Sequence, residues 1–225
     1  MKNLKYLDII TVFFVVALLV SNIASTKITQ VGFMVLDGGT LLFPLTYIFG
    51  DILTEVYGFK KSRRVIWLGF LSCILMSVVF GIVGLLPSAS GWDNQDAYMK
   101  ILGQTPRIVL ASLIAYFFGA FSNSFILAKM KVLTKGKWLW TRTIGSTLVG
   151  QFLDSIIFVL IAFTGVVSKE LLFELIIFNY IFKTAVEVAF TPLTYLIVDK
   201  LKKKENEDYY DTKTNFNPFK AEKLS

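Results

Sequence analysis

Eight polar or charged residues interrupt stretches of the chain that are otherwise strongly apolar: Asp51, Glu55, Asn123, Gln151, Asp154, Asn179, Lys183 and Glu187. A charged side chain at the centre of a bilayer costs about 2.5–3.5 kcal/mol on insertion scales, so such residues usually face a cavity or a partner. Carboxylate and amide oxygens accept hydrogen bonds, while the lysine ammonium and the amide nitrogens donate them. The eight residues are therefore candidates for binding a polar solute.

The spacing of five of these residues places them on shared helix faces. Asp51 and Glu55 are separated by one helical turn, and so are Lys183 and Glu187. Side chains at i and i+4 lie on one face of a helix. Asn179 precedes Lys183 by another turn, so this segment predicts one continuous polar stripe.

The other three candidates lie within two further apolar segments. Asp154 is near the middle of one segment, with Gln151 about one turn before it, and Asn123 lies within the other. Carboxylates outnumber the lysine among the eight candidates, so pairing with that lysine cannot neutralise them all. A polar cavity shared by several helices explains this excess.

Two simpler interpretations stay open. Lys183 and Glu187 could form a self-neutralising pair that only helps their helix to insert. Glu55 lies near the end of its apolar segment and could pair with Arg63 or Arg64 at the membrane interface. In both cases the charges would have a structural role.

Composition identifies the class of protein that carries these residues. Apolar side chains make up 55% of the 225 residues, and Phe alone occurs 21 times. The apolar runs are about twenty residues long, which is the length needed to cross a bilayer as a helix. The formal charge is +7, but the basic residues lie between the apolar runs and at the tail, which indicates membrane topology and not nucleic-acid binding.

The apolar runs predict an all-α polytopic membrane protein with six transmembrane helices. The loop between the third and fourth helices, 88–104, is polar and is expected to form a surface helix or a lid. The six expected spans are Leu7–Ala24, Leu41–Tyr57, Val65–Leu86, Ile108–Ala128, Thr143–Phe163 and Leu171–Val198.

Lys and Arg set the expected orientation of these spans. Segments on one side hold fifteen of them up to Lys204, and segments on the other side hold four. The positive-inside rule then places both termini in the cytoplasm. We expect residues 1–201 to form one transmembrane domain and residues 202–225 to form a charged cytoplasmic tail with little order.

Missing residue types and motifs exclude several kinds of chemistry. The chain has no histidine and one cysteine, so neither a His- nor a Cys-based metal site is expected, and no cofactor is predicted. A nucleotide-binding P-loop is absent. Two aspartates in apolar segments suggest an intramembrane aspartyl protease, but Ile48 replaces the first glycine of its Gly-x-Gly-Asp motif and Leu153 replaces its tyrosine. The protein is not expected to be an enzyme.

The segment FPLTYIFGDILTEVYGFKKSRRVIWLGF, residues 43–70, resembles the signature of the queuosine precursor transporter family, also called the vitamin uptake transporter family. RIVLASLIAYFFG from Arg107, WLWTRTIGSTLVGQFLDSIIFVLIAFTG from Trp138 and YIFKTAVEVAFTPLTYLIVDKLKKKE from Tyr180 agree with it. The resemblance covers nearly the whole chain. Asn123 departs from it, because many relatives have an acidic residue there.

The resemblance implies a six-helix protein of the cell membrane, with a bundle like that of the substrate-binding S components of energy-coupling-factor transporters. It implies uptake of 7-cyano- or 7-aminomethyl-7-deazaguanine, or of queuine, for queuosine in tRNA. We favour a stand-alone carrier. The alternative is an S component that needs a separate ATPase module. The expected partners are the base and the lipid bilayer. An energy-coupling module and a second copy of the chain stay open as further partners.

A 7-deazaguanine base would suit the candidate residues. Its N1–H and 2-amino groups are adjacent donors that one carboxylate can accept together, and its O6 is an acceptor. We expect Asp154 or Glu187 to bind the donor edge, and Lys183 or Asn179 to bind O6. Asp51 and Glu55 would serve an inner gate or the recognition of a cationic group.

Overall fold

The computed structural model describes residues 4–219 as a bundle of long helices with one short β-hairpin. In chain order the elements are α1 (Leu7–Ala24), β1 (Ile28–Val31), β2 (Met34–Asp37), the 3-10 helix η1 (Gly38–Leu41), α2 (Phe43–Tyr57), α3 (Phe59–Leu85), α4 (Gln95–Ile101), the 3-10 helix η2 (Leu102–Gln104), α5 (Thr105–Leu133), α6 (Leu139–Phe163) and α7 (Lys169–Glu205).

Each of the six expected spans corresponds to a long helix, but their lengths and compositions differ. Four helical stretches are long and apolar enough to cross a membrane: α1, α3, the run 95–133 and α6. The helix α2 has only 15 residues, and α7 carries many charged residues. Length and composition alone therefore do not identify these two helices as membrane spans. The polar loop forms α4, in agreement with the expected surface helix.

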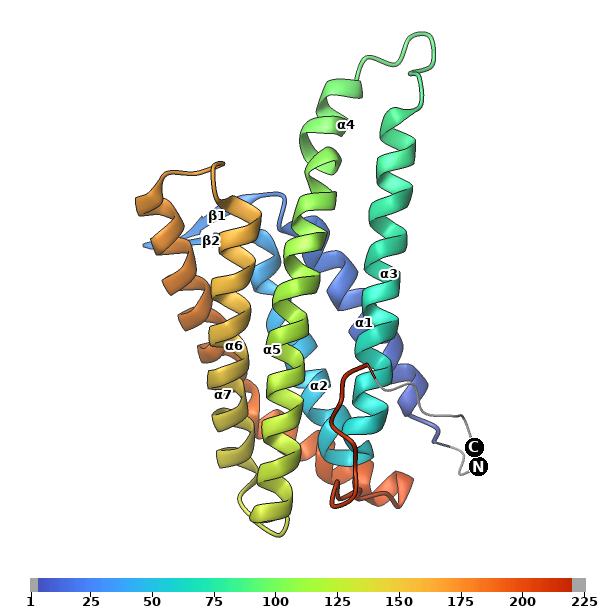
Figure 1. Ribbon diagram of the computed structural model, residues 1–225, viewed down its shortest axis with the longest axis vertical. Helices are drawn as coiled ribbons and strands as arrows, with labels where there is room; N and C mark the ends of the chain where they lie inside the picture. The colour runs from blue at the N-terminus through green and yellow to red at the C-terminus, as the bar shows by residue number, and fades with distance from the viewer. Residues whose placement is uncertain (1–3, 220–225) are drawn as a thin grey trace.

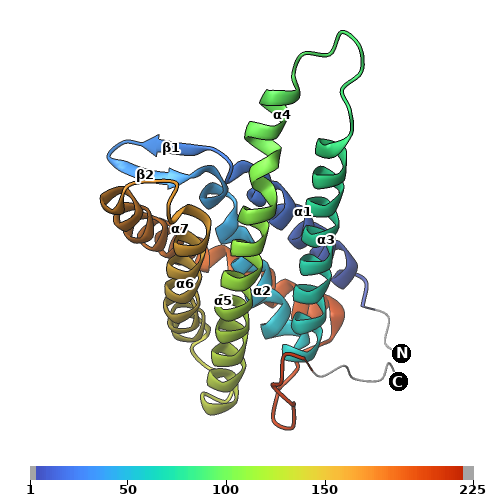
Figure 2. The same ribbon diagram turned by 45° about the horizontal axis from the view of Figure 1, so that its top comes forward.

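Two ends of the bundle can be distinguished. The β1–β2 hairpin and α4 lie at one end in both views (Figures 1 and 2), and the hairpin pairs Ile28 with Asp37 and Val31 with Met34. At the other end the start of α1 meets the end of α7, because the Tyr6 backbone N–H donates to Glu205 Oε1 at 2.7 Å. The first and last long helices therefore begin and finish at the same end.

The helix α2 lies in the middle of the bundle (Figure 1), and thirteen of its fifteen residues are buried. It ends where Gly58 adopts a positive φ of 84°, which favours glycine and breaks the helix. The next helix, α3, starts at Phe59 directly after this turn. All polar side chains along α2 must therefore find partners inside the protein.

Helices α5 and α6 pack closely because glycine lies at their crossing. A Cβ atom added to Gly150 would lie 2.9 Å from the Cβ of Asn123 and 2.9 Å from the carbonyl oxygen of Gly119. The Tyr47 hydroxyl reaches the same crossing and donates to the Gly150 carbonyl at 3.5 Å. This crossing fixes the positions of the polar residues on α5 and α6 relative to α2.

The described part of the tail makes several hydrogen bonds to α3, and the expectation of little order for residues 202–225 stays a prediction. The Asp211 carboxylate accepts hydrogen bonds from the Phe59 backbone N–H, and the Trp67 indole donates to the Pro218 carbonyl at 2.8 Å. Arg63 donates to the carbonyl oxygens of Asn215 and Asn217. The tail is charged, but it docks through these bonds to polar groups at the start of α3. Residues 220–225 of the expected tail lie outside the described residues.

Candidate functional site

All eight candidate residues are buried, and the largest exposed fraction among them is 4%, at Glu187. They divide into three clusters. The central cluster comprises Asp51, Asn123, Thr147, Gln151, Asp154, Lys183 and Glu187. The outer cluster comprises Ser25, Asp37, Thr40 and Asn179, and the inner cluster comprises Glu55, Lys131, Arg142, Lys202 and Asp208.

The central cluster contains one buried ion pair. The Lys183 ammonium donates to Asp154 Oδ2 at 2.9 Å, and its nitrogen also lies 4.5 Å from the Phe43 ring centroid and 5.6 Å from that of Phe158. Lys183 thus bridges α6 and α7 and does not pair with Glu187, its neighbour on the same helix. The self-neutralising interpretation of Lys183 and Glu187 is therefore wrong.

Two other carboxylates in the central cluster are held by neutral side chains. Asn123 Nδ2 donates to Asp51 Oδ1 at 2.7 Å. Glu187 accepts hydrogen bonds from the Thr147 hydroxyl and from Gln151 Nε2, the latter at 3.1 Å. Within residues 4–219 neither Asp51 nor Glu187 has an ion-pair partner.

Several buried acceptors in this cluster have no hydrogen-bond partner within the described chain. They are Asn123 Oδ1, Gln151 Oε1 and Asp154 Oδ1. A buried acceptor without a donor loses the hydrogen bonds that it would make with water, so native proteins keep few of them. Two of the three lie on α6, about one turn apart. The central cluster can therefore accept several further hydrogen bonds from a ligand that is rich in donors.

Asn179 belongs to the outer cluster, whereas Lys183, one turn later on α7, binds Asp154 in the central cluster. Its Nδ2 donates to Asp37 Oδ2 at 3.0 Å, and its Oδ1 accepts from the Thr40 hydroxyl at 2.9 Å. Asp37 also accepts from Ser25 and caps η1 through the Gly39 and Thr40 backbone N–H groups. Sequence reasoning missed Asp37, although Asp followed by Gly-Gly-Thr is a helix N-cap signal.

A cavity of about 10 Å³ lies between the outer cluster and the ion pair, lined by Asn22, Asp37, Phe43, Phe158 and Lys183 among others. A volume of this size holds about one water molecule. The conformation is therefore closed around the Asp154–Lys183 pair, and a planar base would need the surrounding helices or side chains to move apart.

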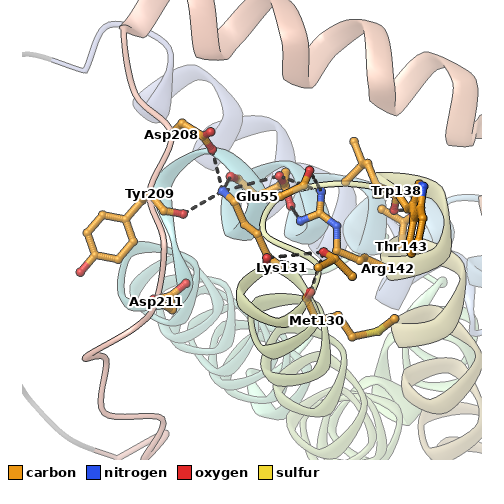
Figure 3. Close-up of polar contacts among 12 residues, drawn as sticks. Glu55, Met130, Lys131, Trp138, Arg142, Thr143, Asp208, Tyr209 and Asp211 are labelled. Atoms are coloured by element: carbon orange, nitrogen blue, oxygen red, sulfur yellow. Dashed lines mark hydrogen bonds and ion pairs between the residues drawn. The ribbon is translucent and has the colours of Figure 1, made fainter.

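The inner cluster is a network of charged side chains around the buried Glu55 carboxylate (Figure 3). Arg142 donates to both Glu55 carboxylate oxygens, at 2.8 and 3.3 Å, and Lys202 donates to Glu55 Oε1 at 2.8 Å. The Lys131 ammonium lies 3.5 Å from the same carboxylate. Glu55 therefore pairs with cations from α5, α6 and α7, and the alternative of a pair with Arg63 or Arg64 is wrong.

The tail completes this network. Asp208 accepts from Lys131 at 2.7 Å, and the Tyr209 carbonyl accepts from Lys131 at 2.8 Å (Figure 3). The Asp208 carboxylate also lies 3.0 Å from the Lys202 ammonium. Partial burial alone would raise the pKa of the Asp208 carboxyl, but the bonds and charges of the two lysines outweigh burial and lower that pKa. The tail thus adds a negative charge where cations are in excess.

Comparison with known proteins identifies the family of the chain. A family model described as "Putative vitamin uptake transporter" matches residues 37–197. The chain is 28% identical over 176 residues to the "Probable queuosine precursor transporter" of Bacillus subtilis (strain 168), covering 78% of this chain and 77% of that protein. It is 24% identical over 170 residues to the "Queuosine precursor transporter" of Escherichia coli (strain K12), covering 74% of each.

A third relative, the "Probable queuosine precursor transporter" of Haemophilus influenzae, is 23% identical over 125 residues, covering 56% of this chain and 51% of that protein. No solved structure matches the chain. The family model covers well over half of the chain and contains all eight candidate residues. The chain therefore belongs to the vitamin uptake transporter family.

Proposed function

We propose that the protein is a stand-alone carrier that takes up queuosine precursors, 7-cyano- or 7-aminomethyl-7-deazaguanine or queuine, across the cell membrane. The observation that carries the proposal is the Asp154–Lys183 pair with its unpartnered oxygen Asp154 Oδ1. The names of the relatives in three bacteria supply the class of substrate.

The pair offers a donor and an acceptor side by side, which complements a guanine-like edge. Asp154 Oδ1 would accept from N1–H or the 2-amino group, and the Lys183 ammonium would donate to O6. Gln151 Oε1, about one turn away on α6, is a second free acceptor for the 2-amino group. The Phe43 and Phe158 rings beside Lys183 offer faces on which the flat base can stack.

Asn179 and Glu187 are less suited to this role than expected from the sequence. Both Asn179 amide atoms already bond to the outer cluster, and Glu187 is held by Thr147 and Gln151. We therefore assign O6 recognition to Lys183 and the donor edge to Asp154. Glu55 serves closure of the inner end, because it ties α2 to three cations there.

The proposal includes six membrane spans with both termini in the cytoplasm. The basic residues support this orientation, because the inner cluster and the tail lie at the end richer in Lys and Arg. In this arrangement α2 and α7 cross the membrane inside the bundle, and protein covers their charges. The hairpin and α4 then face outside, and the closed cavity lies near that end.

A rescue assay tests the function. The chain is expressed in a bacterium that cannot make queuosine precursors and lacks its own importer, and each of the three bases is supplied separately. Queuosine in tRNA is read from mobility in boronate gels. We expect a shift with at least one base, which would also show that no dedicated ATPase is needed.

Two variants sharpen this assay. Asp154→Asn is expected to abolish the shift while the protein still reaches the membrane, whereas Asp96→Asn on the exposed helix α4 should behave like the parent. A normal shift with Asp154→Asn would refute the assigned role of the pair. No shift for the parent protein, despite good expression, would refute the stand-alone carrier, and restoration by a coupling ATPase module would favour an S component.

A further inference from the structure

Two buried carboxylates of the central cluster, Asp51 and Glu187, differ from Asp154 and Glu55 in their surroundings. They are 2% and 4% exposed, and within residues 4–219 no lysine or arginine pairs with either. By contrast, Asp154 has Lys183, and Glu55 has Arg142 and two lysines. Asp37, which also has no cationic partner within the described chain, accepts hydrogen bonds from three side chains and two backbone N–H groups. Asp51 and Glu187 are not required by the recognition of the base described above.

An ionised carboxylate in such surroundings is costly unless a cation or several donors stabilise it. Asp51 accepts a hydrogen bond from the Asn123 side chain, and Glu187 accepts two, from Thr147 and Gln151. The two acids also lie within electrostatic reach of each other, so each disfavours the charge of the other. A bound proton removes both the unpaired charge and the repulsion.

The unpartnered amide oxygens provide a place for such a proton to be held. Asn123 and Gln151 each donate to one of the acids through nitrogen, and the oxygen of each amide has no donor. Rotation of a side-chain amide by half a turn exchanges its oxygen and nitrogen, so a rotated amide accepts where it had donated. A protonated carboxyl group could therefore donate to either amide oxygen.

We propose that Asp51 and Glu187 form a proton-binding site that couples uptake to the proton gradient. This proposal rests on the transport function proposed above and extends it to the source of energy. The charged and titratable groups that face the site come from the three neighbouring helices and from α2 itself: Tyr47, Glu55, Tyr116, Asp154 and Lys183.

One residue connects the proton site with the base-binding pair. Gln151 Nε2 donates to Glu187, and Gln151 Oε1 is free on the helix that carries Asp154. A base that bonds to Gln151 Oε1 would fix the amide in the orientation that donates to Glu187. Lys183 lies one turn before Glu187 on α7, so loss of its bond to Asp154 would also change the charge near the proton site.

Infrared spectroscopy tests the proton site without any substrate. A protonated carboxyl group has a C=O stretching band separate from the bands of a carboxylate. We expect this band in the purified protein at pH 7, reduced in Asp51→Asn or in Glu187→Gln. The exposed-site controls Asp96→Asn and Glu174→Gln should leave it unchanged. Absence of the band from the parent protein at pH 7 would overturn the proposal, whether or not the variants fold.

Transport into proteoliposomes tests the coupling, with radiolabelled 7-cyano-7-deazaguanine as the probe. A gradient of one pH unit supports about tenfold accumulation per coupled proton. We expect accumulation in the parent and in the two control variants. Asp51→Asn or Glu187→Gln should lose accumulation but retain exchange of labelled for unlabelled base.

The two readouts separate this proposal from the carrier function. Exchange without any response to the pH gradient would overturn proton coupling and leave the carrier intact, as would accumulation that follows a sodium gradient. A protein that shows neither exchange nor accumulation would refute the carrier and with it the coupling, while the infrared band would still report the proton.

Discussion

At the scale of single residues, the partners of each buried acid decide its role. Asp154 shares one oxygen with Lys183 and keeps the other free, which suits it to bind a ligand without losing its countercharge. Glu55 is bonded by Arg142 and Lys202 and reached by Lys131, which suits it to hold helices together. The same functional group, a carboxylate, therefore keeps an oxygen free in the central cluster and joins helices in the inner cluster.

Breaking the Asp154–Lys183 pair should separate its effects on stability and binding. Asp154→Asn leaves a buried ammonium without a countercharge, and removal of one partner from a buried pair costs about 3–5 kcal/mol. We expect a clear drop in the thermal unfolding temperature in detergent. Adding Lys183→Met should restore much of the stability, while uptake stays absent. Restored uptake in the double variant would show that the pair serves folding alone.

At the scale of elements, the close α5–α6 crossing predicts that alanine substitutions at two glycines of α6 change the stability of the protein in opposite directions. Alanine removes an entropic cost of about 1 kcal/mol wherever glycine lies in a helix. At Gly145 a Cβ would meet only Met130, at 3.6 Å, so Gly145→Ala should be neutral or stabilising.

At Gly150 the added Cβ would lie 2.9 Å from backbone and side-chain atoms of α5. Overpacking of this kind costs about 1–3 kcal/mol, which exceeds the entropic gain. We expect Gly150→Ala to lower the unfolding temperature and reduce uptake, because α5 and α6 carry Asn123 and Asp154. Equal unfolding temperatures for Gly145→Ala and Gly150→Ala would contradict the close crossing.

The docked tail should respond to acid through Asp208. The pKa of this carboxyl is lowered in the folded protein, so its bonds to Lys131 and Lys202 stabilise docking above the ordinary value of 3.8. That contribution is lost as the pH falls below 3.8 through the lowered value. Trp67 fluorescence reports docking, because its indole bonds to the Pro218 carbonyl.

In a background whose other three tryptophans are replaced by phenylalanine, which serves here as the parent, we expect the Trp67 signal to change as the pH falls from 7 to well below 3.8. Asp208→Asn should already be partly undocked at pH 7 and should change less on acidification. Asp199→Asn, at an exposed position of α7, should follow the parent. Identical titrations of Asp208→Asn and the parent would argue against a role of Asp208 in docking.

Local sequence signals predicted the helices well but not their partners. The apolar runs placed all six long helices, and the start and end of the first match α1. The partner of Glu55 was not predictable, because Arg142 lies 87 positions away and only the packing of α2 against α6 brings them together. The contacts of the tail were not predictable for the same reason, since its charges complement groups that are distant in sequence, such as Lys131.

At the scale of the whole molecule, the structure is closed at both ends of the polar interior. The cavity beside Lys183 holds about one water, and beyond the central cluster the inner cluster binds α2, α5, α6, α7 and the tail together. A carrier must open one end at a time, so the two clusters are expected to loosen alternately. The two ends face opposite sides of the membrane, as the proposal requires, if α2 and α7 cross it together with the other four helices.

Cysteine labelling on intact cells decides between four and six spans. Cys73 is buried and is replaced by serine, and single cysteines are then placed at the exposed positions Ser90 and Lys213. If only α1, α3, α5 and α6 cross the membrane, Ser90 and Lys213 both lie on the same side as the N-terminus. A membrane-impermeant maleimide then labels both cysteines or neither. If α2 and α7 cross as well, Ser90→Cys lies outside and Lys213→Cys inside. We expect labelling of Ser90→Cys only, with Lys213→Cys labelled after the cells are permeabilised, because charges enclosed by neighbouring helices do not prevent a helix from crossing.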